Sequence, residues 1–90
     1  MPEISETLRA RFREHADEPS HLEAVIVTLA PEGDAGALEA AGMQIEHRMR
    51  GQPIVTGRMT ATTLDTLSTV KGIVRIEPEG EMRALDDQGP

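Results

Sequence analysis

The sequence contains no cysteine, tryptophan or tyrosine, and it has one phenylalanine among its 90 residues. Without cysteine, the chain has neither a disulfide framework nor a thiolate that could act as nucleophile or metal ligand. With one aromatic residue, it also lacks the stacking surfaces on which single-stranded nucleic acids are held. The core must therefore be built from Val, Ile, Leu, Met and Ala, and we expect one small domain of modest stability.

Long apolar runs and positive charge are scarce as well. No stretch approaches the roughly 20 apolar residues that cross a bilayer, and the N-terminus lacks the apolar core of a signal peptide. The formal net charge is −7, whereas nucleic-acid binding requires a basic face. We therefore expect a cytoplasmic protein that binds neither nucleic acid nor membrane. Its acidity is expected to serve solubility, and the alternative is a preference for a partner with a basic surface.

Hydrophobic periodicity divides the chain into an N-terminal helix, a central domain and a tail. Ile4, Leu8 and Phe12 recur at four-residue spacing, which predicts an amphipathic helix over residues 3–16. Turn-forming residues then make a short linker. The predicted organisation is a helix and linker over residues 1–20, a domain over 21–80 and an extended tail over 81–90.

Within the central domain, strands and helices alternate. Runs rich in β-branched residues or alternating in polarity predict strands at 23–29, 43–50, 54–60 and 73–76. Helices are predicted at 35–41 and 61–70, with Asp34 and Thr60 as N-caps and Gly42 and Gly72 as C-terminal glycines. Gly57 indicates a bulge or a close packing contact inside its strand.

The resulting order, β-α-β-β-α-β, predicts an α+β fold of the ferredoxin-like type. In this sandwich, two helices cover one face of a four-stranded antiparallel sheet, and here an extra N-terminal helix precedes it. The uncovered face is predicted to display Ile26, Ile54 and Ile73 among charged residues. Such a mixed surface suits a partner interface of about 800 Å² per side.

Motifs that carry chemistry are missing from the sequence. There is no glycine-rich phosphate loop and no nucleophile elbow. His15 and His21 flank the linker, and His47 is predicted on the inward face of a strand beside Ile45. No histidine pair has the i, i+4 spacing of a helical metal site, and the sequence shows no carboxylate cluster around them. We therefore expect no enzymatic activity, no cofactor and no metal site.

Four segments resemble, in their order and spacing, a family of protease-binding proteins. They are AVIVTL at 24–29, MQIEHRM at 43–49, GRMTATTLDTL at 57–67 and VKGIVRIEPEGEMRAL at 70–85. Together they are similar to the subtilisin propeptide family and its free-standing relatives, the intracellular inhibitors of subtilisin-like serine proteases. The resemblance implies an inhibitor or folding chaperone that packs the open face of its sheet on the protease.

The resemblance also implies a role for the tail, which would lie in the active-site cleft like a product. Leu85 would occupy the primary specificity pocket and Met82 the fourth pocket back from the cut, with Arg83 and Ala84 between them. An extended segment can bind in this way because main-chain hydrogen bonds give affinity while separated side chains give selectivity. Residues 86–90 extend past the end that the family pattern would give, so Leu85 is not a free terminus.

The N-terminal helix is a second departure from that family, and its apolar stripe allows two placements. Ile4, Leu8 and Phe12 would either cover the open sheet face, which blocks protease docking, or pack on a second copy to form a homodimer. The homodimer belongs to a different function, that of a non-enzymatic ferredoxin-like module for self-association or regulation. A domain that binds a small regulatory ligand ranks last, because no convergent polar site is visible.

Overall fold

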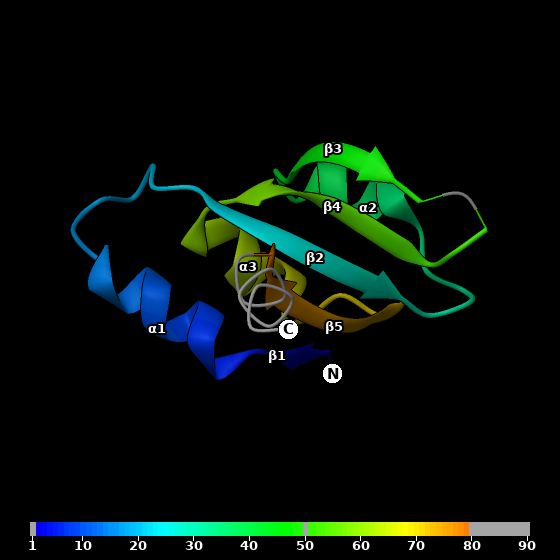
Figure 1. Cartoon of the computed structure of the whole chain (residues 1–90), viewed down its shortest axis with the longest axis horizontal. Helices are drawn as coiled ribbons and strands as arrows, with labels where there is room; N and C mark the ends of the chain where they lie inside the picture. The colour runs from blue at the N-terminus through cyan, green and yellow to red at the C-terminus, as the bar shows by residue number, and fades with distance from the viewer. Residues whose placement is uncertain (1, 50, 80–90) are drawn as a thin grey trace, which may run out of the picture.

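The computed structural model describes residues 2–49 and 51–79 of the chain (Figure 1). These residues form an α+β fold with one five-stranded mixed sheet and three helices. The strand order is β1-β5-β2-β4-β3, and β1 runs parallel to β5 while the other neighbours are antiparallel. The elements are β1 (Glu3–Ile4), α1 (Glu6–Glu14), β2 (Glu23–Leu29), α2 (Ala35–Ala40), β3 (Gln44–Arg48), β4 (Ile54–Met59), α3 (Ala61–Leu67) and β5 (Ile73–Pro78).

The strands and helices predicted after residue 20 are confirmed, with ends that move by a few residues. The Asp34 carboxylate accepts a hydrogen bond from the Gly36 N–H at 2.9 Å, and the Thr60 hydroxyl accepts one from the Thr63 N–H at 3.3 Å. Both caps satisfy N–H groups that have no partner inside the helix. Within the described ranges, no helix is long and apolar enough to cross a membrane.

The start of the chain differs from the prediction, because residues 3–4 form a strand rather than the first turn of a helix. Glu3 and Ile4 pair in parallel with Arg75 and Ile76 of β5, and the Ser5 N–H donates to the Ile76 carbonyl at 3.0 Å. The outer edge of β5 would otherwise leave backbone groups unpaired. This pairing adds a fifth strand to the four that were predicted, and α1 begins only at Glu6.

The hydrophobic core lies between the sheet and the helices. Val25 and Val27 of β2 are fully buried and belong to the same core cluster as Leu64 and Leu67 of α3. In Figure 1 the strands overlie α2 and α3, so both helices cover the same face of the sheet. The buried cluster comprises Leu8, Phe12, Val25, Val27, Leu38, Met43, Val55, Met59, Leu64, Leu67, Ile73 and Ile76.

Helix α1 belongs to this helix layer and does not cover the opposite face. Leu8 and Phe12 are 0% and 7% exposed and are part of the core cluster. Phe12 also lines a shallow pocket together with Ala61 and Leu64 of α3, and Figure 1 shows α1 beside the sheet rather than across it. Both side chains therefore pack inside their own chain, and neither is exposed for the homodimer contact that the sequence allowed.

The predicted inward orientation of His47 is wrong. The pairing of β3 with β4 shifts between Ile45, which lies opposite Gly57, and His47, which lies opposite Thr56. An extra residue in one strand reverses the alternation of side chains beyond it. His47 is consequently exposed, and Met49, which the same alternation placed inside, is 48% exposed.

The predicted position of Ile73 on the open sheet face is wrong for a similar reason. The pairing of β5 with β2 shifts between Thr28 and Leu29, so that Ile73 lies opposite Leu29. Without this shift, Ile73 would point to the same side of the sheet as Arg75, two residues later. Ile73 is 7% exposed and belongs to the core, whereas its neighbour Val74 is 48% exposed. The strand predicted at 73–76 is also too short, because β5 continues through Pro78, which is buried opposite Val25.

Gly57 confirms the close contact that the sequence indicated. A Cβ atom at this position would clash with the backbone carbonyl oxygen of Gln44 on the neighbouring strand. The glycine therefore allows β3 to approach β4 at the point where the β3 register shifts.

The position of α1 predicts a large cost for truncating its buried stripe. We expect Leu8→Ala to lower the free energy of unfolding by about 2–5 kcal/mol, because it removes a fully buried side chain and leaves a cavity. Thr7→Ala, on the exposed side of the same helix, should stay within about 0.5 kcal/mol of wild type. Urea denaturation measures both, and equal values for the two variants would show that α1 does not pack on the core.

Candidate functional site

The face of the sheet opposite the helices forms a continuous uncovered surface in the described part of the chain. Ile26 of β2 lies opposite Thr56 of β4, and Thr28 lies opposite Ile54. Residues that pair directly across antiparallel strands point to the same side of the sheet. We call this surface the open face, and it comprises Ala24, Ile26, Thr28, Ile54 and Thr56 at its centre with Arg58, Arg75 and Glu77 around them.

The open face has a half-buried apolar centre and a charged rim. Ile26 and Ile54 are each of intermediate exposure, and small or β-branched residues separate them. At the rim, Arg58 lies 3.5 Å from Glu46, and Arg75 lies 3.9 Å from Glu3. Solvent-exposed pairs of this kind contribute little to stability, so their partners can be exchanged at small cost. This is the layout of a protein–protein interface, with an apolar core and a polar rim.

The structure brings together two of the residues that the sequence assigned to partner binding. Ile26 and Ile54 lie on the open face as predicted, while Ile73 lies in the core. The tail residues Met82, Arg83, Ala84 and Leu85 are outside the described residues, so their assignment stays a prediction.

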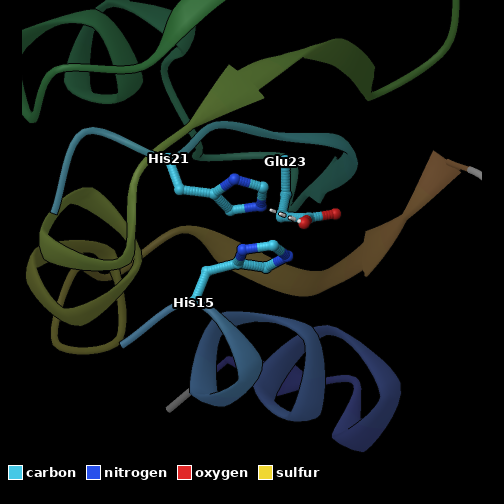
Figure 2. Close-up of side chains that lie close together, drawn as sticks. All are labelled: His15, His21 and Glu23. Carbon is cyan, nitrogen blue, oxygen red and sulfur yellow. Dashed lines mark hydrogen bonds and ion pairs between the residues drawn. The ribbon is translucent and has the colours of Figure 1, made fainter. Parts of the chain in front are cut away.

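A second group of polar side chains lies on the helix side of the sheet, where α1 meets β2. His15 follows the end of α1, His21 lies two residues before β2, and Glu23 is the first residue of β2. Figure 2 shows the two imidazole rings one above the other with the Glu23 carboxylate beside them. The ring centroids are 3.7 Å apart with planes 14° from parallel, and His21 Nε2 lies 2.5 Å from Glu23 Oε2.

This cluster contradicts the expectation that no carboxylates surround the histidines. The residues are not at any helical spacing, so the pattern of the sequence did not reveal them. Two backbone hydrogen bonds bring them together: the Glu18 N–H donates to the His15 carbonyl, and the His21 N–H donates to the Glu18 carbonyl. The turn-forming residues between His15 and His21 were the available signal, because a tight reversal there must place both ends side by side.

A hydrogen bond between His15 and Glu18, at the border of this cluster, shifts the pKa values of both residues. A hydrogen bond from His15 Nδ1 to Glu18 Oε1, 3.0 Å long, raises the pKa of His15 above its ordinary value of 6.5. The same bond lowers the pKa of the Glu18 carboxyl below its ordinary 4.5. The His15 contribution to stability is present below pH 6.5 and is lost as the pH rises through the raised pKa. The Glu18 contribution is present above pH 4.5 and is lost as the pH falls, so the pair stabilises most in mildly acidic solution.

No family model matches this chain, and no curated protein or solved structure matches it significantly.

The Glu18 hydrogen bond predicts a change that NMR can measure. We expect Glu18→Gln to lower the pKa of His15 in metal-free protein, because the neutral amide no longer stabilises the imidazolium charge. Titration of the His15 ring proton resonances, with a chelator present, gives that pKa directly. Glu39→Gln, which removes an exposed carboxylate of α2 that pairs with Arg48 instead, is the control and should leave the His15 curve in place. An unchanged curve in Glu18→Gln would contradict the assigned hydrogen bond.

Proposed function

We propose that this chain is a propeptide-like inhibitor or folding chaperone of a subtilisin-like serine protease, and that the open face is its docking surface. The observation that carries the proposal is the placement of α1 in the helix layer. Had its stripe covered the sheet, docking through that face would have required the helix to swing away. With Leu8 and Phe12 buried on the other side, α1 does not obstruct this face, and no element within residues 2–49 and 51–79 has to move for a partner to reach it.

The finer architecture supports the same proposal. The segment from β2 to β5 has the strand order β5-β2-β4-β3 in the sheet. Helix α2 connects β2 to β3, and helix α3 connects β4 to β5. This is the order expected of a ferredoxin-like βαββαβ unit, with α1 and β1 as additions before it. The resemblance to the subtilisin propeptide family implies this unit, and in that family the sheet face without helices meets the protease.

The chemistry of the open face suits a tight but reversible contact. Ile26 and Ile54 supply an apolar centre that a partner can desolvate, and exposed Arg58 and Arg75 can exchange their present carboxylate partners for others. In the proposed complex, the tail would follow from the end of β5 into the cleft, with Leu85 and Met82 in separate pockets.

The experiment that tests this function is inhibition of a broad-specificity subtilisin-type protease by the full chain. We expect submicromolar inhibition, slow cleavage after Leu85, and strong weakening by Leu85→Asp because a charge would enter an apolar pocket. Peptide-substrate assays measure the inhibition, and mass spectrometry of the mixture identifies the trimmed product. No inhibition across a panel of such proteases at micromolar concentrations would contradict the proposal.

The docking surface is tested separately with two variants of equal charge. Ile26→Glu places a carboxylate at the centre of the open face and should weaken inhibition by about tenfold or more, because buried interface centres carry most of the binding energy. Thr62→Glu adds the same charge on the exposed side of α3 and should leave inhibition unchanged. Circular dichroism confirms that both variants fold. If both variants inhibited equally weakly, the assignment of the open face as the docking surface would be contradicted.

A further inference from the structure

Three possible metal ligands from the two ends of one short linker converge where α1 meets β2. One ring nitrogen each from His15 and His21 and one carboxylate oxygen from Glu23 all lie within 4.8 Å of one another. All three residues are of intermediate exposure, so the group is reachable from solvent yet partly enclosed. The rings of Phe12 and His21 make a T-shaped contact, with centroids 6.4 Å apart and planes 83° apart.

We propose that His15, His21 and Glu23 bind one divalent transition-metal ion of the zinc class. Two imidazoles and one carboxylate form a donor set that zinc accepts in proteins, with water in the fourth position. The imidazole nitrogens also favour zinc, nickel and copper over the harder ions magnesium and calcium. The proposal is independent of protease binding, because the cluster lies on the helix side of the sheet and the open face lies on the other.

The outer contacts of the three ligands are those that a metal site needs. His15 uses Nδ1 for its hydrogen bond to Glu18, which leaves Nε2 for the ion. A carboxylate on the other ring nitrogen is the usual support of a metal-binding histidine. Arg11 lies 3.7 Å from Glu23 Oε1, so Oε2 is the oxygen directed toward His21. The arginine charge opposes a cation, and this is why we expect moderate rather than very tight affinity.

Binding requires a small local rearrangement. Ligands about 2.0–2.2 Å from a tetrahedral zinc ion are about 3.3–3.6 Å from each other. Ligand atoms as far apart as 4.8 Å must therefore approach, whereas His21 Nε2 and Glu23 Oε2, which are 2.5 Å apart, must separate by about 1 Å. Rotation of the side chains supplies this movement, with the stacked rings of His15 and His21 tilting apart. The ion then takes the place of the proton between His21 Nε2 and Glu23 Oε2.

The consequence of such a site would be a link between two elements of the fold. His15 marks the end of α1, and Glu23 is the first residue of β2. An ion that binds both in the native state and neither in the unfolded chain stabilises the native state by mass action. The metal would therefore hold α1 in the helix layer and should raise the midpoint of thermal unfolding.

The third histidine of the chain provides a matched control for the experiment. Isothermal titration of the chelator-treated full chain with zinc chloride should show one ion per chain. His15→Asn and His21→Asn should each weaken binding at least tenfold, and Glu18→Gln about tenfold, because it removes the outer support of His15. His47→Asn, on exposed β3, should bind as wild type does.

Wild-type protein supplies a test that does not depend on the folding of any variant. Added zinc should shift the ring resonances of His15 and His21 in NMR spectra and leave those of His47 unchanged. The proposal is overturned if zinc at millimolar concentration shifts neither ring, or if His47→Asn lowers the affinity as much as His21→Asn does.

Discussion

Burial of Leu8 and Phe12 in the hydrophobic core is the interaction on which the arrangement of the molecule depends. A helix of nine residues is too short to be stable alone in water, so α1 exists because these side chains enter the core. Their burial fixes the helix on one side of the sheet, and the other side is left uncovered by residues 2–49 and 51–79. It also requires the chain to turn back after residue 14 to enter β2, and that reversal brings His15, His21 and Glu23 together.

The same contact explains the two-residue strand that precedes the helix. With α1 held beside the sheet, residues 3–4 run along β5, and their pairing covers an edge that would otherwise present unpaired backbone groups. Ile4 lies opposite Ile76 and packs against the core from this edge. The N-terminal segment is thus part of the fold rather than an appendage, and both candidate sites depend on where it lies.

The parts of the fold with strong local signals were predictable from sequence. The β-branched run of β2, the apolar spacing of α3 and the capping residues Asp34 and Thr60 are all local features. The register shifts near His47 and Ile73 were not predictable, because an alternating pattern assumes that neither strand gains a residue. A strand of two residues such as β1 is too short to show any periodicity in its sequence. Its pairing is set instead by the position of α1.

The two candidate sites differ in the same way. Ile26 and Ile54 were identified from sequence because alternation along regular strands decides which face they occupy. The cluster of His15, His21 and Glu23 depends on a turn and on the position of a helix, and neither is encoded in residue spacing. Histidines that are far from any helical metal-site spacing can therefore still share a site when a tight turn joins their elements.

The position of α1 is most directly measured by nuclear Overhauser contacts from Phe12, the only phenylalanine in the chain. With α1 in the helix layer, the ring protons of Phe12 should show contacts to the His21 ring and to the methyl groups of Leu64. Contacts from Phe12 to the methyl groups of Ile26 and Ile54 instead would place the helix across the open face, and would contradict both the packing and the proposed docking surface.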